Sequence, residues 1–255
     1  NRVKAQELLE RGTDARVRYL ADPKAATLLK FMVSYASAMD SAADMIAQGN
    51  PTQAIPILRN ALKQRPNDPG LMNNLSAGYW ASGQREKALK TLRDAIKSNP
   101  DHFGVHNQLA SYLLDSGQAD SALPIAQRAA ELDPDSAAAQ FNHGKALCSV
   151  GRHDACLEKL NRAKERGARD IAIFRALGGT AAMLRQYEQA GAHYEEGVAA
   201  YPNAVDLWLG LAEVRIRLDN VNAAREAWAA ARGVAPNHPR VSAFEQRLQS
   251  LEQQP

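Results

Sequence analysis

Residues 69–102 read PGLMNNLSAGYWASGQREKALKTLRDAIKSNPDH, and the same spacing of small, bulky and turn-forming residues returns every 34 residues along the chain. Prolines mark this period most plainly, at Pro66, Pro100, Pro134, Pro202 and Pro236. The single interruption is Ala168, which stands where the remaining proline would fall. A fixed period of about 34 residues indicates a two-helix unit stacked on copies of itself.

When the proline is numbered position 32, six repeats follow: 35–68, 69–102, 103–136, 137–170, 171–204 and 205–238. Position 20 is small in every repeat, at Ala54, Ala88, Ala122, Cys156, Ala190 and Ala224. Position 15 is glycine in four repeats, at Gly49, Gly83, Gly117 and Gly151. A glycine just past a helix end supplies a left-handed cap, so each repeat is predicted to hold helix A (about positions 2–14), a tight turn and helix B (about 17–30). An Asp or Asn follows the proline in five repeats and is expected to help cap the next helix.

This pattern resembles the tetratricopeptide repeat, whose consensus is large–Leu–Gly–Tyr on helix A and Ala–large–Ala–Pro on helix B. The second repeat carries it at Leu75, Tyr79, Ala88, Leu92, Ala95 and Pro100, and the fifth at Phe174, Leu177, Gly178, Ala190, Tyr194 and Pro202. The resemblance covers residues 35–238 and implies an all-α fold: a right-handed α-solenoid superhelix of six 34-residue helix–turn–helix repeats with helical caps. It implies little about which partner is bound, because such arrays serve many partners.

The two ends of the chain do not follow the consensus. Residues 1–34 are interpreted as an N-terminal helical cap, with a short helix over about 3–20 and a longer one starting near Pro23. A dimer contact or a junction to a preceding domain is the alternative for this segment. Residues 239–255 are interpreted as a C-terminal capping helix, because Val241, Phe244, Leu248 and Leu251 give it one apolar face.

The charge balance argues against nucleic acid as a partner. The net charge is +3, and residues 1–34 hold 7 Lys and Arg against 4 Asp and Glu, so the rest of the chain carries 24 of each sign. A nucleic-acid-binding array would need a basic stripe. No apolar run approaches the roughly 18 residues that a membrane span requires. The chain starts at Asn1 rather than methionine, so a removed leader or upstream domain stays open, as does the choice between a cytoplasmic and a periplasmic location.

The sequence offers no catalytic, cofactor or metal site, since it contains no phosphate-binding glycine loop, no HExxH and no GxSxG. His102 and His106 stand one helical turn apart beside Asp101, but two imidazoles are a weak metal signal, and His106 falls at a packing position. Cys148 and Cys156 flank the turn of the fourth repeat. They are either two buried thiols or a disulfide, which would imply an oxidising compartment.

Polar residues follow the helix A positions that line the concave face in such arrays. In repeats 2 to 4 these are Asn73, Asn74, Asn107, Gln108, Ser111, Asn142 and Lys145, with Trp80, Phe141, Arg175 and Met183 nearby. A side-chain amide both donates and accepts, so amides spaced one per repeat would suit the backbone of an extended peptide. They resemble the asparagine ladders of peptide-binding tetratricopeptide superhelices. The competing interpretation is that they are ordinary solvated residues. The paired basic residues of the chaperone-binding carboxylate clamp are absent.

The resemblance therefore favours a non-catalytic protein–protein interaction scaffold that binds an extended or helical peptide segment in its concave groove. The alanine- and arginine-rich composition favours a place in a bacterial multiprotein assembly. The assembly considered is one that builds a pilus, a secretion apparatus or an exported polysaccharide. The alternative is a targeting region of a larger enzyme (a glycosyltransferase, sulfotransferase or protease) with its catalytic domain upstream. Self-association through the N-terminal helices is a further hypothesis.

Overall fold

The computed structural model describes the backbone of residues 23–252 and the side chains of residues 35–250. Within that part of the chain there are thirteen α-helices and no strand. The helices are α3 (Pro23–Ala47), α4 (Pro51–Gln64), α5 (Pro69–Ala81), α6 (Arg85–Ser98), α7 (Phe103–Asp115), α8 (Ala119–Leu132), α9 (Ala137–Ser149), α10 (His153–Glu165), α11 (Ile171–Met183), α12 (Tyr187–Ala200), α13 (Val205–Arg217), α14 (Val221–Val234) and α15 (Pro239–Glu252). The predicted all-α solenoid of helical repeats is thereby confirmed, while the helix expected over residues 3–20 lies outside the described residues.

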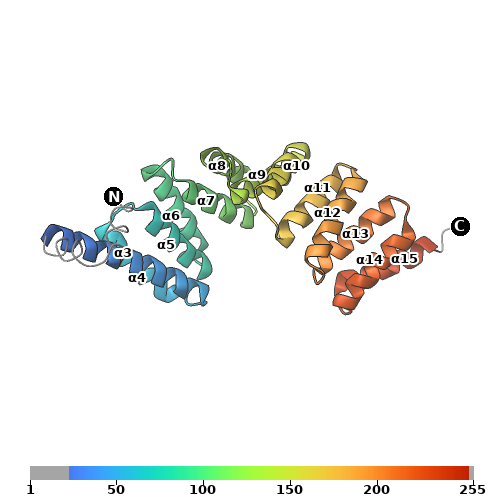
Figure 1. The fold of residues 1–255 in the computed structure, drawn as a ribbon, viewed down its shortest axis with the longest axis horizontal. Coiled ribbons are helices and arrows are strands. Elements are labelled where there is room, and N and C mark those ends of the chain that lie inside the picture. The colour runs from blue at the N-terminus through green and yellow to red at the C-terminus, as the bar shows by residue number, and fades with distance from the viewer. Residues whose placement is uncertain (1–22, 253–255) are drawn as a thin grey trace, which may run out of the picture. The chain divides into compact units, whose positions relative to one another are not determined.

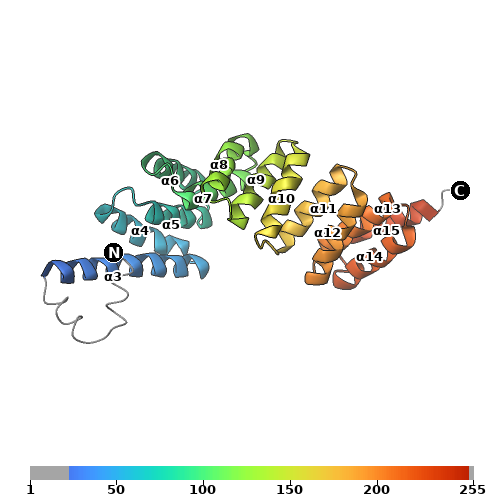
Figure 2. The same ribbon diagram turned by 45° about the horizontal axis from the view of Figure 1, so that its top comes forward.

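The chain divides into two compact units, with the boundary between Val105 and His106 inside α7. In the first unit, α4 packs on α3 and α5, and α5 also packs on α3 and α6. In the second unit, each helix from α8 to α15 packs on a neighbour in sequence, and α11 also packs on α9 and α13. Figures 1 and 2 show these successive helices lying side by side within each unit. In each unit the helices therefore stack as consecutive helix A and helix B layers.

Four of the helix A elements, α5, α7, α9 and α11, are capped by the side chain at position 34, one place later than the sequence suggested. The side chains of Asp68, Ser136 and Asp170 each accept a hydrogen bond from the backbone N–H three residues ahead, over 3.0, 3.3 and 2.9 Å. His102 Nδ1 accepts from a backbone N–H in the same way, at 3.3 Å. The expectation that the residue after the proline is the cap was wrong before α9 and α13, whose N-caps are Ser136 and Ala204, and before α5. There Asn67 belongs to the turn itself, with φ at 64°.

The turn between helix A and helix B has a left-handed residue at position 15 in all six repeats. The φ angles are 79° at Gly49, 78° at Gly83, 72° at Gly117, 79° at Gly151, 59° at Arg185 and 55° at Asp219. The next N–H bonds the carbonyl five residues back, over 2.8 to 2.9 Å in every repeat. The last two repeats therefore make the same helix-ending turn without the glycine that favours it.

Arg185→Gly should stabilise the fifth repeat. A side chain in the left-handed region costs about 1–2 kcal/mol, and the greater unfolded-state entropy of glycine offsets part of that gain, so we expect about 1 kcal/mol of added stability. Gly117→Ala, whose added Cβ meets no neighbour, is the matched reverse change and should lose about 1 kcal/mol. Urea unfolding followed by circular dichroism measures both. A less stable Arg185→Gly protein would contradict the assignment of the turn.

In the core of the second unit, the bulky residues Leu160 and Tyr194 at position 24 face glycines on adjacent helices. Tyr194 is buried on α12, and a Cβ added at Gly178 on α11 or Gly210 on α13 would lie 2.7 or 2.5 Å from its ring. Such distances are shorter than real contacts, so the tyrosine fits only because both positions lack a side chain.

The last described helix closes the core of the second unit. Val241, Phe244 and Leu248 of α15 are buried, and the ring nitrogen of buried Trp228 on α14 donates to the Val241 carbonyl oxygen at 3.0 Å. Three of the four apolar residues predicted for the C-terminal helix are thus buried against the second unit, while the side chain of Leu251 lies outside the described residues. Assigning residues 239–255 as a cap in the intact protein remains a prediction.

Candidate functional site

Positions 2, 5, 6, 9 and 13 of the helix A elements form what is here called the A-helix face. In the first unit, α5 carries Asn73 and Asn74, with Trp80 at the neighbouring position 12. In the second unit the sequence-predicted site residues on α7, α9 and α11 are Asn107, Gln108, Ser111, Phe141, Asn142, Lys145, Arg175 and Met183. The predicted stripe is therefore described in two parts, one in each unit.

Two amides of the predicted ladder bond each other instead of facing solvent independently. Asn142 is only 8% exposed, and its Nδ2 donates to Asn107 Oδ1 at 2.9 Å. This bond joins α9 to α7, so the pair stabilises the stacking of adjacent repeats. In the first unit, Asn73 Oδ1 is buried and has no hydrogen-bond partner among the described residues. The amides of the predicted ladder therefore lie in different environments, and they do not all face solvent in the same way.

A cavity of about 510 Å³ lies on the A-helix face between α9 and α11. Phe141, Lys145, Arg175 and Met183, all predicted from the sequence, line it together with Cys148, Ser149, Leu160, Ala172, Ala176, Gly179 and Thr180. Met183 is 67% exposed, which is unusual for so large an apolar side chain. The cavity combines exposed apolar surface with two cationic groups.

The two cations of this cavity are only loosely neutralised. Lys145 Nζ lies 3.7 Å from Asp115 Oδ1, and an Arg175 guanidinium nitrogen lies 3.7 Å from Asp206 Oδ2. Both distances exceed hydrogen-bonding range. Asp206 also forms a closer ion pair with Arg240, so its charge is shared between two guanidinium groups. Each cation therefore has one carboxylate nearby but no direct hydrogen bond to it.

The sequence left open whether the two cysteines are bonded, and in the structure they form a disulfide. Cys148 on α9 and Cys156 on α10 form a disulfide with a Cα–Cα distance of 5.2 Å, and the described residues hold no free cysteine. Thr180 Oγ1 on α11 lies 3.1 Å from Cys148 Sγ and 3.7 Å from Cys156 Sγ. The bond ties the two helices of the fourth repeat together directly beside the cavity.

Reduction of this disulfide should destabilise the fourth repeat. The bond closes a loop of 8 residues, for which loop-closure entropy predicts about 2–3 kcal/mol. Thermal unfolding with and without reductant measures the loss, and the intact mass should rise by two hydrogen atoms on reduction. The variant Cys148→Ala with Cys156→Ala is the control and should not respond to reductant. An unchanged mass of the purified protein would show two thiols instead.

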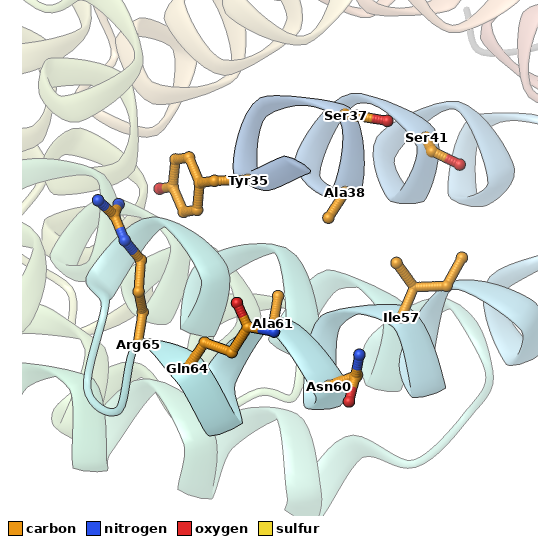
Figure 3. A pocket seen from close by; sticks show the side chains of 9 residues that line it. All are labelled: Tyr35, Ser37, Ala38, Ser41, Ile57, Asn60, Ala61, Gln64 and Arg65. Atoms are coloured by element: carbon orange, nitrogen blue, oxygen red, sulfur yellow. The ribbon is translucent and has the colours of Figure 1, made fainter. Parts of the chain in front are cut away.

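A second cleft, of about 340 Å³, lies between α3 and α4 in the first unit. Figure 3 shows Ala38 of α3 pointing toward α4 and Ile57 of α4 pointing toward α3. The α3 wall carries Ser37 and Ser41 at positions 3 and 7, and Ser37 is exposed, whereas position 3 is buried and apolar in every later repeat. This cleft lies off the A-helix face, and Arg65 is the one charged residue that lines it.

Burial shifts the pKa values of several titratable side chains in the described part of the chain. Burial lowers the pKa values of His143 and His193 and raises the pKa of Tyr112 to about 12. His106 is 4% exposed at its packing position. Residues 35–250 contain no group of three His, Cys, Asp or Glu side chains able to hold a metal ion. None of the described helices has the length and apolar character needed to cross a membrane.

Sequence reasoning missed the small residues of α11 that line the cavity. Ala172, Ala176 and Gly179 occupy positions 2, 6 and 9 of the A-helix face on α11. In each of the other repeats, at least one of these three positions carries a polar or charged side chain. That run of small residues was visible in the sequence. The sequence alone did not show that these small residues line the same cavity as Phe141 and Met183.

Comparison with known proteins places the chain in a family. The model of the tetratricopeptide repeat matches residues 45–111, 113–178 and 181–248. No curated protein sequence matches the chain. Many solved structures are similar in fold, and those described below share little sequence identity with the chain. PilF of Pseudomonas aeruginosa aligns at 14% identity with a TM-score of 0.75, over 86% of this chain and 99% of its own.

PilW, described as a widely conserved type IV pilus biogenesis factor, aligns at 18% identity with a TM-score of 0.74, over 82% of this chain and 97% of its own. YrrB, described as having an unusual peptide-binding site, aligns at 15% identity with a TM-score of 0.64, over 74% and 97%. These likenesses show the shared fold. Because the repeat model accounts for most of its length, the chain belongs to the tetratricopeptide repeat family.

Proposed function

We propose that this chain is a non-catalytic scaffold that binds a segment of a partner protein along its A-helix face. The observation that carries the proposal is the cavity between α9 and α11, where Phe141 and Met183 supply apolar surface and Lys145 and Arg175 supply charge. Members of this family act generally as protein-interaction scaffolds, and an array of stacked helices offers a long surface to a polypeptide.

We propose further that the scaffold works within a bacterial multiprotein assembly. Two of the solved structures that align with more than four-fifths of this chain are PilF and PilW. PilW is described as a pilus biogenesis factor, and that role supports an assembly function here by analogy of fold. The disulfide between Cys148 and Cys156 agrees with an assembly exposed to an oxidising compartment such as the periplasm.

Affinity capture with a matched pair of variants tests this function. Ser111→Arg places a large cation on the A-helix face of α7, whereas Ser121→Arg makes the same change on exposed α8, a helix B element. The tagged wild-type protein and both variants are incubated with a lysate of the source organism, and bound proteins are quantified by mass spectrometry. Recovery of the partner should fall at least about tenfold for Ser111→Arg and stay unchanged for Ser121→Arg. Equal recovery by all three proteins would contradict binding on the A-helix face.

A further inference from the structure

The cavity between α9 and α11 has a counterpart two repeats further along the chain. This counterpart is a cavity of about 460 Å³, distinct from the cleft between α3 and α4, and residues of α13 and α15 at the equivalent positions line it. The matching residues differ by 68 in number, and they are Phe141 and Leu209, Lys145 and Glu213, Ala172 and Arg240, Ala176 and Phe244, and Gly179 and Arg247. The chain therefore contains two versions of one site with different side chains.

In the second version, the chain supplies both an apolar group and a charge from α15. Phe244 is only 9% exposed, because its ring packs into the core beside Leu209. Arg247 forms an ion pair with Glu213 of α13. In this cavity, therefore, an aromatic ring occupies the apolar part, and a charged group pairs with the opposite charge at position 9.

In the first version, the same places hold smaller side chains and the opposite charge. Ala176 stands at the position of Phe244, and Gly179 stands at that of Arg247. Lys145 takes the position of Glu213, so the sign at position 9 is reversed. None of the residues that line this cavity is acidic, and Arg175 adds a second cation that is 60% exposed. The complement of this cavity is therefore a large apolar side chain accompanied by a negative charge.

We infer that the cavity between α9 and α11 binds an aromatic or large aliphatic side chain of a partner segment, next to an Asp or Glu of the same segment. The apolar side chain lies over Ala176 and Gly179, between Phe141 and Met183. The carboxylate pairs with Lys145 and Arg175, where charge-assisted hydrogen bonds are strongest. This inference rests on the proposed function and names the chemistry of the partner.

The disulfide makes the cavity a preorganised site. Cys148 is part of the cavity lining, and its bond to Cys156 holds α9 against α10. Thr180, another lining residue, contacts both sulfur atoms from α11. Two walls of the cavity are thereby fixed before a partner arrives, which reduces the entropy lost on binding.

Selection from a phage-displayed library of random twelve-residue peptides tests the inference, because the probe is defined without knowledge of the natural partner. On the intact wild-type chain, enriched peptides should carry Phe, Tyr, Trp, Leu or Ile within two residues of Asp or Glu. Their affinity for Ala176→Phe, which restores the side chain found in the second version, should be at least about tenfold lower. The double variant Lys145→Glu with Arg175→Glu should instead select peptides with Lys or Arg beside the apolar residue.

Arg128→Glu with Arg162→Glu, two changes on helix B elements, is the control for the charge reversal and should select the same peptides as wild type. Enrichment without the apolar and acidic pair, or no enrichment at all, would overturn the inference. So would an unchanged preference in the Lys145→Glu and Arg175→Glu protein, which does not depend on whether Ala176→Phe folds. In those cases, loss of the natural partner by Ser111→Arg would still support the proposed function. Failure of the inference about the cavity can therefore be told apart from failure of the proposed function.

Discussion

Gly210→Ala lowers the free energy of unfolding by about 3 kcal/mol, the upper end of the usual cost of overpacking. The added methyl group would lie 2.5 Å from the Tyr194 ring, and that ring cannot withdraw because it is buried in the core and also meets Gly178 at the α11 side. Chemical unfolding monitored by circular dichroism measures the loss. Gly233→Ala is the matched control, because its added Cβ meets no atom within 4 Å. This control should be neutral or stabilising, since alanine is the better helix former by about 1 kcal/mol.

A second substitution separates the collision from a general effect of Gly210. Leucine occupies position 24 in the fourth repeat, where Leu160 faces Gly144. Tyr194→Leu should therefore relieve the crowding, so the cost of Gly210→Ala should shrink by about 1–2 kcal/mol in that background. Strictly additive losses in the double variant would show that the tyrosine ring is not the group that Gly210 accommodates.

Trp228→Ala should release α15 from the end of the second unit, with a loss of about 3–5 kcal/mol. The change leaves a hole beneath Val241 and Phe244 and removes the 3.0 Å hydrogen bond to the Val241 carbonyl oxygen. Stability in a stacked array is local, so the loss should appear as fast amide hydrogen exchange in α14 and α15 while α9 and α10 stay protected.

Trp228→Phe keeps most of the apolar volume and removes mainly the hydrogen bond, so it should cost about 1 kcal/mol and leave α15 docked. Unchanged exchange of α15 in the Trp228→Ala protein would contradict the role assigned to this side chain. The two substitutions together divide the contribution of Trp228 between packing and hydrogen bonding.

The regular part of the fold could be predicted from the sequence because it repeats. The prolines and the small residue at position 20 set the register, and the helices of the second to sixth repeats begin and end within a residue or two of the expected positions. Local departures were less visible. The left-handed residues Arg185 and Asp219 were not predicted, because the glycine that marks this position in the first four repeats is absent from the last two.

The candidate site was predictable only in part. Helical spacing placed Phe141, Lys145, Arg175 and Met183 on one face, and the structure brings these four together around one cavity. Spacing alone could not show that Asn142 would turn toward Asn107, because that bond depends on the distance between two helices that are separate in sequence. The same holds for the cysteines, whose spacing around the turn was compatible with either two thiols or a disulfide.

Site-specific photo-crosslinking in cells of the source organism tests the central claim most directly. Benzoylphenylalanine replaces Met183 on the A-helix face in one protein and exposed Gln127 on α8 in another, and the crosslinked peptides are identified by mass spectrometry. The account predicts that the Met183 position captures one partner segment containing a large apolar residue beside an Asp or Glu, and that the Gln127 position does not capture it. Capture of the partner from Gln127 but not from Met183 would contradict the account.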